Sequence, residues 1–393
     1  MKTVGIICEY NPFHLGHAGH IEKTRSVLNG DCAVVCVMSG NFVQRGEPAV
    51  FSKHVRAETA VRCGADLVIE LPVPYALSSA EGFAAAGVYI LDKLGICDHI
   101  SFGSESGDIK ALTEAARVMA SDEAGRLTRE WLGKGLSYAS AQQKAADVIL
   151  GSRSDILKSP NNLLGIEYIK ALIRSGSSLL PITVERTGGD HDGDTGYSAS
   201  ALRRSLAKGD APWAFMPDAA AALYRDEINA GRGPVSAERY ELAVLSRLRM
   251  INEFSVLAGI SEGLENRLKK YINTEPSVGA ILEKTKTKRY AMSRLRRLLM
   301  CAVLGVRREA AELPPPYIRV LAMNDKGKKL LGAARKKAEL PVIVKPSSAK
   351  KLTERAAEMF ETEAAATDFY VLAFNDPKER SGGKEWSVNP VII

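Results

Sequence analysis

The chain has 393 residues, 46% of them hydrophobic and 25% charged, which is the composition of an ordinary globular protein. This length exceeds what one ordinary hydrophobic core accommodates, so two or three domains are expected. The sequence has no signal-peptide pattern and no apolar run of about 18 residues, which excludes a transmembrane helix. These features predict a cytoplasmic protein without a membrane attachment.

Six cysteines are spread along the chain without a CxxC pair. Zinc sites need closely spaced pairs, and only Cys32 and Cys36 approach that spacing. Disulfides do not persist in the cytosol. We therefore expect buried free thiols, and no residue is assigned as a metal ligand.

The first hundred residues alternate between apolar runs and helical patterns. The run CAVVCVM at residues 32–38 is typical of a parallel strand that is buried on both faces. Strands that alternate with helices predict a Rossmann-like open parallel sheet, in which ligands bind beyond the carboxyl ends of the strands. The predicted strands lie at residues 3–8, 32–38, 66–71 and 99–102, and the predicted helices lie at about 14–28, 53–63 and 80–94.

The next hundred residues continue this α/β pattern. A helical stretch at 109–150 is broken by glycines at 133 and 135. A long loop at 39–52 joins a strand to a helix, and long loops at strand carboxyl ends are often functional. The remaining predicted elements are a helix at 163–172 that Pro160 starts, a strand at 181–186, and a serine-capped helix in SASALRRSL.

From residue 213 the pattern changes. Residues 217–311 have apolar positions at i, i+3 and i+4 and no strand-like run, so they are predicted to be helical. We therefore predict an α/β catalytic domain at 1–212 and a mainly helical, basic region at 213–393. The short strands expected in the second region lie at 317–323, 340–344 and 369–374.

The most informative motif is HxGH, which follows the first strand as His14, Leu15, Gly16 and His17. Its spacing puts both imidazoles on one face of the first helical turn, where free N–H groups and the helix dipole attract an anion. Gly16 removes a side chain where a ligand would approach. Imidazole N–H groups can bind phosphate oxygens and offset the charge that builds when the α-phosphorus is attacked. The motif therefore predicts an ATP site with His14 and His17 as catalytic residues, although two histidines can also merely cap a helix.

A second helix start carries further anion-binding groups. Ser198, Ser200 and Arg203 are predicted to contact the β- and γ-phosphates from the side opposite HxGH. Arg186 ends the fifth predicted strand, so it is expected at the same edge of the sheet. Gly103 follows the fourth strand and would allow the nucleotide to approach closely.

Other polar residues leave alternatives open. His191 and Asp192 lie in the glycine-rich loop at 187–196, where they can contact the substrate or Mg²⁺ or belong to a simple turn. Asn161 and Asn162 can cap a helix or hydrogen-bond adenine or ribose.

Two basic clusters account for much of the net charge of +7. Residues 284–297 contain seven basic residues and no acidic one, and residues 326–337 contain six and none. Such runs can be solvated helix faces, but the absence of acidic neighbours in sequence favours a polyanion partner. Tyr290, within the first cluster, could stack on a base.

Several stretches, taken in order, carry a resemblance to a known family. They include EYNPFHLGHAGH, SGNFVQRGEPAVFSKHVRAE, SPNNLLGIEYIKAL, SASALRRSL and KTKRYAMSRLRRLL. Together they resemble the bacterial tRNA(Met) cytidine acetate ligase family, over residues 5 to about 331. HxGH alone marks only the wider nucleotidylyltransferase superfamily. The loop at 187–196 departs from the family pattern in being more acidic.

The resemblance implies an enzyme that uses ATP, with Mg²⁺, to join acetate to the wobble cytidine of elongator tRNA(Met) through an acetyl-adenylate. It implies ATP contacts at 7–20, Gly103, Arg186 and one asparagine of PNN, for which we favour Asn162. With the second helix start added, the residues assigned to ATP are Ile7, Cys8, Glu9, Tyr10, Asn11, Pro12, Phe13, His14, Leu15, Gly16, His17, Ala18, Gly19, His20, Gly103, Asn162, Arg186, Ser198, Ser200 and Arg203. The residues assigned to tRNA are Lys286, Lys288, Arg289, Arg294, Arg296 and Arg297.

Three other functions are weaker. A small-molecule adenylyltransferase of the same superfamily would use the same N-terminal domain but leaves the basic helical region without a role. A non-enzymatic RNA-binding protein would not need both His14 and His17. An acetyltransferase that uses acyl-CoA would need a CoA-binding loop with a different glycine pattern. The oligomeric state and the choice of one tRNA stay open.

Overall fold

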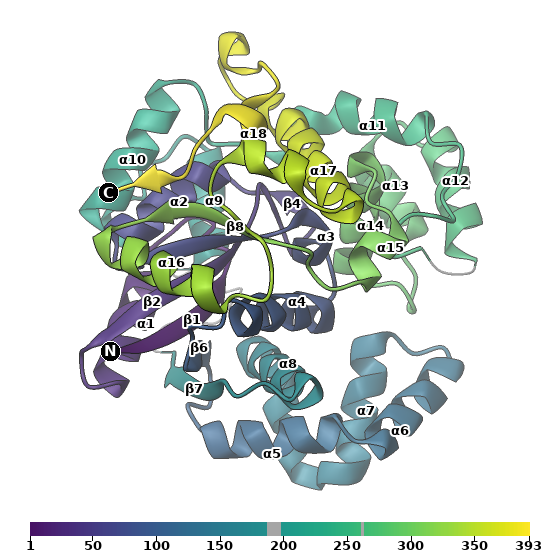
Figure 1. Cartoon of the computed structure of the whole chain (residues 1–393). Helices are drawn as coiled ribbons and strands as arrows, with labels where there is room; N and C mark the ends of the chain where they lie inside the picture. The colour runs from purple at the N-terminus through teal and green to yellow at the C-terminus, as the bar shows by residue number, and fades with distance from the viewer. Residues whose placement is uncertain (187–197, 261–262) are drawn as a thin grey trace.

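The structure is a computed structural model that describes residues 1–186, 198–260 and 263–393 (Figure 1). Its centre is a sheet in the order β10-β8-β5-β2-β1-β6-β7, with β9 paired to β8. The run from β5 to β7 is parallel, and its strand order reverses between β1 and β6. Ligands of doubly wound sheets bind at such a reversal. The strands are β1 (Lys2–Cys8), β2 (Cys32–Ser39), β5 (Leu67–Leu71), β6 (His99–Ser104), β7 (Leu180–Glu185), β8 (Ile318–Met323), β9 (Val342–Ile343) and β10 (Val391–Ile392).

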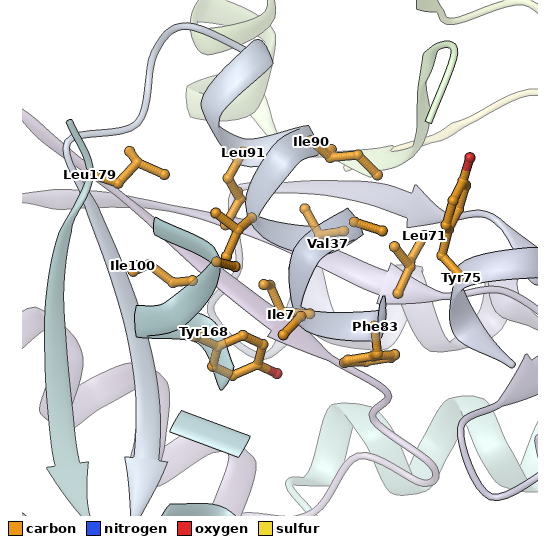
Figure 2. Packing of buried hydrophobic residues seen from close by; sticks show 14 of the residues in the cluster. Ile7, Val37, Leu71, Tyr75, Phe83, Ile90, Leu91, Ile100, Tyr168 and Leu179 are labelled. Carbon is orange, nitrogen blue, oxygen red and sulfur yellow. The ribbon is translucent and has the colours of Figure 1, made fainter. Parts of the chain in front are cut away.

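Both faces of the parallel strands are buried. In β2 the side chains of Val34 and Cys36 enter one core, and those of Val35 and Val37 enter the other. Figure 2 shows the second core, where helices cover the sheet. A Cβ atom on Gly5 would lie 2.4 Å from Leu91 Cδ1, so this glycine allows the helix to approach β1 closely.

Helices cover the two faces as expected for an α/β domain. α1 (Leu15–Val27), α2 (Lys53–Arg62), α9 (Ala199–Ala207) and α10 (Asp218–Asn229) contribute to one core. α4 (Ala80–Lys93), α8 (Pro160–Ser175) and α16 (Asp325–Lys337) contribute to the other. The remaining helices of the first half are α3 (Val73–Ala76), α5 (Ile109–Met119), α6 (Asp122–Gly133) and α7 (Tyr138–Leu150).

A third core lies in the C-terminal half, among helices that follow residue 235. After these helices the chain returns to the sheet, because β8 pairs antiparallel with β5 and β10 pairs parallel with β8. Residues on both sides of position 212 therefore share one sheet, and the proposed domain boundary does not separate them. The helices of this half are α11 (Glu241–Arg249), α12 (Leu264–Thr274), α13 (Val278–Thr285), α14 (Met292–Leu304), α15 (Arg308–Glu312), α17 (Glu354–Val371) and α18 (Lys384–Ser387).

The structure confirms the Rossmann-like sheet followed by a mainly helical region, and it corrects several details. The strand expected at 369–374 is wrong, because residues up to Val371 belong to α17. Tyr370 and Phe374, from this apolar run, pack into the third core. The prediction failed because a short apolar run is compatible with a strand or with a buried helix. The long loop at 39–52 contains a hairpin of β3 (Phe42–Val43) and β4 (Glu47–Pro48). No helix in the described ranges is long and apolar enough to cross a bilayer.

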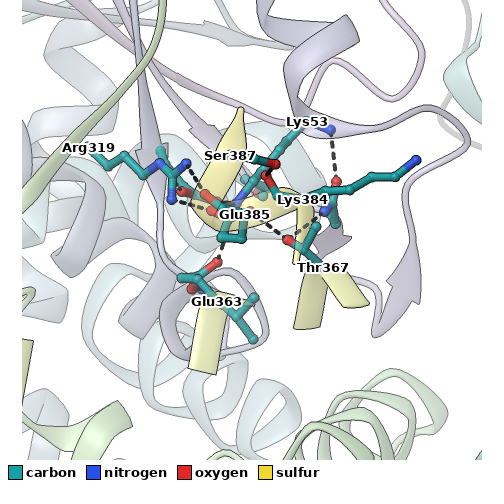
Figure 3. A network of polar contacts seen from close by, with 12 residues as sticks. Lys53, Arg319, Glu363, Thr367, Lys384, Glu385 and Ser387 are labelled. Atoms are coloured by element: carbon teal, nitrogen blue, oxygen red, sulfur yellow. Dashed lines mark hydrogen bonds and ion pairs between the residues drawn. The ribbon is translucent and has the colours of Figure 1, made fainter. Parts of the chain in front are cut away.

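A buried ionic cluster connects the carboxyl end of β5 to the end of the chain (Figure 3). Lys53 Nζ donates to Glu70 Oε1 at 2.5 Å and to Glu385 Oε1 at 2.7 Å. Arg319, at the start of β8, also donates to Glu385. Thr367 Oγ1 donates to Glu385 Oε2 at 2.7 Å. All five of these residues are buried, so each charge depends on its protein partners.

A third carboxylate, Glu363, lies beside this cluster, with Oε2 at 3.9 Å from Lys53 Nζ. Burial raises the pKa of Glu363 well above its usual value, and the nearby Glu70 raises it further. Burial also raises the pKa of Glu385, but Lys53 and Arg319 outweigh it and lower that pKa below its usual value. The cations Lys53 and Arg319 therefore lie among three buried carboxyl groups, and the raised pKa of Glu363 favours its uncharged form.

Candidate active site

The turn between β1 and α1 is fixed by three segments that are distant in sequence. Asn11 Oδ1 accepts the Val50 N–H at 2.8 Å, and the Phe13 N–H donates to Tyr224 Oη at 3.0 Å. Arg203 Nη1 donates to the Asn11 carbonyl at 2.8 Å. These contacts orient the backbone that leads into HxGH. The turn is therefore built by the sheet, the 39–52 loop, α9 and α10 together.

His14 and His17 form a reciprocal cap at the start of α1. His14 Nδ1 accepts the Gly16 N–H at 3.1 Å, and the His14 N–H donates to His17 Nδ1 at 3.3 Å. Each Nδ1 is therefore an acceptor, which places the proton of each neutral ring on Nε2. The two ring centroids are 3.8 Å apart, so both Nε2–H groups belong to one small site.

The histidines of this helix are held in the neutral form. Burial lowers the pKa of His14 to about 4, and the positive charges of Arg186 and Arg203 lower it further. Burial also lowers the pKa of His17 well below its usual value, with further contributions from His14 and Arg186. Two arginines therefore lie near the imidazoles. Positive charge placed in this way attracts anions to this end of the sheet.

His20 lies one turn further along α1, away from the capped pair. Its Nε2 is 3.1 Å from Ser101 Oγ, and Ser101 Oγ is 2.7 Å from Thr24 Oγ1. Burial lowers the pKa of His20 to about 4, and Arg186 lowers it further. A neutral His20 thus connects α1 to β6 through side-chain hydrogen bonds.

The structure explains why residue 16 is a glycine in a way that the sequence alone did not. A Cβ atom at this position would lie 2.9 Å from Cε1 of His14, so the absent side chain makes room for the His14 ring. The glycine thus allows the His14 ring to fold back onto its own helix start. That it also lets a ligand approach the backbone stays a prediction.

Arg186 and Gly103 lie side by side at the ends of β7 and β6. The Arg186 N–H donates to the Ser104 carbonyl at 2.9 Å, which extends the pairing of these strands. A Cβ atom on Gly103 would lie 3.0 Å from Arg186 Cγ. The glycine therefore leaves room for the stem of an arginine whose charge acts on all three histidines of α1.

Asn162 and Glu105 connect α8 to the end of β6. Asn162 Oδ1 accepts the N–H groups of Glu105 and Ser106 at 3.0 and 3.1 Å. In return, the Glu105 carboxylate accepts the N–H groups of Asn161 and Asn162 at 3.1 and 2.8 Å. The expectation that an asparagine caps this helix is wrong, because α8 begins at Pro160 and Glu105 supplies the cap. Asn162 thereby fixes the loop that follows Gly103.

The second helix start has the geometry expected for α9. Ser198 Oγ accepts the Ala201 N–H at 3.1 Å, so Ser198 is the N-cap. Arg203 Nη2 donates to Ser200 Oγ at 3.0 Å while its Nη1 reaches the HxGH turn. α9 is therefore joined directly to the histidine site. His191 and Asp192 lie outside the described residues.

Arg56 is a residue of the site that sequence analysis missed. Its buried guanidinium donates to the carbonyls of Phe51 and Ser39 at 3.0 Å each, and also to those of Glu9 and Gly40. It thus joins the ends of β1 and β2. The only signal in the sequence is an arginine one turn into a helix that follows a long loop.

The first basic cluster, residues 284–297, runs from the end of α13 into the first turns of α14 and is only partly exposed. Lys286, Lys288 and Arg289 are exposed, and Arg296 forms an ion pair with Glu47 at 2.8 Å. The expectation that Tyr290 stacks on a base is wrong, because its side chain is buried. Arg294 and Arg297, at the same surface, are half-buried.

The second basic cluster lies at the opposite edge of the sheet from HxGH. Met323, at the end of β8, pairs with Leu67 at the start of β5, and α16 begins two residues later. At its other end, the Lys337 carbonyl would lie 2.8 Å from a Cβ atom on Gly95, which precedes β6. The two basic clusters therefore belong to different surfaces. In the described ranges, no group of three or more His, Cys, Asp or Glu residues is placed to bind a metal ion.

Comparisons with known proteins agree with this geometry. The sequence model of the HIGH Nucleotidyl Transferase family matches residues 1–385. The tRNA(Met) cytidine acetate ligase of Acetivibrio thermocellus is 38% identical, with all of both chains covered. That of Caldanaerobacter subterraneus subsp. tengcongensis is 39% identical, with 96% of each chain covered.

A solved structure has the same fold over its whole length. The crystal structure of Thermotoga maritima TmcAL bound with alpha-thio ATP superposes with a TM-score of 0.92 at 36% identity, covering 100% of both chains. The apo form of the same protein gives 0.93 at 35% identity, again over all of both chains. The chain therefore belongs to the HIGH nucleotidyl transferase family and, within it, to the tRNA(Met) cytidine acetate ligases.

Proposed function

We propose that this protein uses ATP to acetylate the wobble cytidine of elongator tRNA(Met), with acetate as the acyl donor. The observation that carries the proposal is the neutral, reciprocally capped pair of His14 and His17 at the strand-order reversal. The family membership supports it over the whole chain.

The first half-reaction is an attack on ATP. An acetate oxygen forms a bond to the α-phosphorus while the bond to the bridging oxygen of the β-phosphate breaks, giving acetyl-adenylate and pyrophosphate. Acetate is already ionised at neutral pH, so it needs no general base. The enzyme must bring two anions together and offset the charge of the pentacoordinate phosphorus.

The described residues suit that task. The Nε2–H groups of His14 and His17 are aimed by their Nδ1 contacts and donate to phosphate oxygens. Arg186 and Arg203 add permanent positive charge beside them. The phosphates of ATP, rather than a protein site, would hold Mg²⁺, which would offset their negative charge.

The second half-reaction transfers the acetyl group. The exocyclic amine of the cytidine attacks the acetyl carbonyl, AMP leaves, and the nitrogen loses a proton. The tRNA approaches over the basic connector between α13 and α14, where Lys286, Lys288 and Arg289 are exposed. Because its substrate is tRNA, we expect the enzyme to act in the cytoplasm.

Mass spectrometry of tRNA nucleosides tests the proposal. Reaction with ATP and isotope-labelled acetate should place the label on one cytidine of elongator tRNA(Met). Without tRNA, the enzyme should still catalyse pyrophosphate exchange into ATP that depends on acetate. The proposal fails if label enters tRNA only from acetyl-CoA. If exchange occurs without tRNA acetylation, a small-molecule adenylyltransferase becomes the better assignment.

A further inference from the structure

The β3–β4 hairpin lies between the nucleotide site and the basic helix α14. On one side, the Gln44 N–H donates to Glu9 Oε1 at 2.7 Å, and Glu9 directly follows β1. The neighbouring Val50 N–H donates to Asn11, as described above. This side of the hairpin is thus part of the turn that carries HxGH.

The other side of the hairpin contacts α14. Glu47 Oε1 accepts from Arg296 Nη1 at 2.8 Å. Gly46 has a φ of +76°, and a Cβ atom on it would lie 2.5 Å from the Arg297 backbone nitrogen. The hairpin therefore packs against the helix backbone and fixes the position of its turn relative to the basic surface.

Arg45 stands at the tip of this hairpin with its side chain exposed. Within the described ranges, its guanidinium makes no ion pair with a carboxylate. It lies near a second cation, because the charge of Arg45 adds to burial in lowering the pKa of Arg203. The Glu9 carboxylate interacts with both arginines and offsets part of their mutual repulsion, and an anion bound beside Arg45 would offset more of it.

We propose that Arg45 binds a backbone phosphate of the tRNA beside the target cytidine, and so positions the base for attack on the acetyl-adenylate. The inference rests on the proposed function. The hairpin contacts the turn that carries HxGH on one side and α14 on the other, so an RNA strand that joins the exposed residues at 286–289 to the histidines runs along it. ATP has its own cations in Arg186 and Arg203. Arg45 is followed directly by Gly46 and Glu47, which contact α14, so Arg45 stands between Arg203 and the basic surface.

The test separates the two half-reactions. Arg45→Ala, Arg45→Glu and Arg45→Lys are compared by kcat/KM for tRNA acetylation and by acetate-dependent ATP–pyrophosphate exchange. We expect acetylation to fall about 10-fold for alanine and about 100-fold for glutamate, with lysine within about 3-fold of the wild type. Acetylation should fall at least about tenfold more than exchange.

Arg335→Glu is the matched control, since Arg335 is exposed on α16 at the opposite edge and the change in charge is the same. This substitution should lower kcat/KM for tRNA acetylation no more than about threefold, because it weakens only the long-range attraction of the tRNA. The proposal is overturned if exchange and acetylation fall together, which would place Arg45 in the ATP site. It is also overturned if Arg335→Glu is as damaging as Arg45→Glu, or if Arg45→Ala acetylates tRNA normally. Failure of the wild-type enzyme to acetylate tRNA would instead refute the proposed function.

Discussion

The His14 N–H donates to Nδ1 of His17, and His14 Nδ1 accepts from the same helical turn, so the two rings share one tautomer. Replacing either ring by alanine removes an Nε2–H donor and the fixed orientation of its neighbour. We expect acetate-dependent ATP–pyrophosphate exchange to fall about 100-fold or more for His14→Ala or His17→Ala. Circular dichroism would verify folding, and substantial exchange by either variant would refute a catalytic role.

The low pKa of His14 gives a stability effect with a defined sign. In the folded protein this pKa is about 4, against an ordinary value of 6.5, so between these pH values only the unfolded chain binds the proton. Stability therefore falls as the pH falls through 6.5, and the loss is complete below 4. From pH 7.5 to pH 5, His14 alone should remove about 2 kcal/mol from the free energy of unfolding.

His14→Asn isolates this contribution, because asparagine still caps a helix but does not titrate. Urea unfolding of the ATP-free proteins at pH 7.5 and pH 5 would measure the difference. Between these two pH values the free energy of unfolding of the variant should fall by about 2 kcal/mol less than that of the wild type. Parallel losses would show that His14 titrates near its ordinary pKa in the fold.

The contact between Gly103 and Arg186 predicts a defect in nucleotide binding. In Gly103→Ala the new methyl group would lie 3.0 Å from Arg186 Cγ, so the arginine stem must move. We expect Kd for ATP to rise about 10-fold, since a displaced cation no longer meets the phosphates. Isothermal titration calorimetry would measure this. Gly133→Ala in α6, where no atom lies within 4 Å of the added carbon, should bind ATP as the wild type does.

The three exposed residues of the first basic cluster allow a test of tRNA binding that leaves the hairpin intact. Lys286→Glu, Lys288→Glu and Arg289→Glu, combined in one variant, should weaken tRNA binding. They should also reduce the slope of log K against log salt by about 3 if each contacts a phosphate. Filter binding at several salt concentrations measures both. An unchanged slope would place the tRNA elsewhere.

Two carboxylates of the buried cluster should respond differently to the same substitution. Glu385→Gln removes the negative charge that accepts hydrogen bonds from both Lys53 and Arg319, and should cost about 3–5 kcal/mol of stability. Glu363→Gln replaces a carboxyl group whose raised pKa favours the uncharged form, and should cost less than about 1 kcal/mol. Denaturant unfolding at pH 7 compares them, and equal losses would mean that Glu363 is ionised.

Much of this fold could be predicted from sequence because its signals are local. The apolar run at β2, the HxGH spacing and the serine cap of α9 each depend on a few neighbouring residues. Their placement at one edge follows from the rules of parallel sheets. The same rules predicted Arg186 and Gly103 at one edge of the sheet.

The features that sequence analysis missed depend on partners that are distant along the chain. Glu105 caps α8 from another element, and a local pattern favoured the asparagines instead. Arg56 contacts carbonyls that only the folded loops bring together. Tyr290 lies among basic residues in sequence, yet the helices of the third core bury it. Local spacing contains no information on any of these contacts.

The ion pair between Lys53 and Glu385 has a consequence for biosynthesis. These residues are 332 positions apart, so a growing chain exposes Lys53 and Glu70 long before their partner exists. Until Glu385 is synthesised, the loop that Lys53 anchors lacks a balanced cluster beneath it. The catalytic edge of the sheet therefore reaches its final form only after Glu385 has been synthesised, although HxGH emerges from the ribosome much earlier.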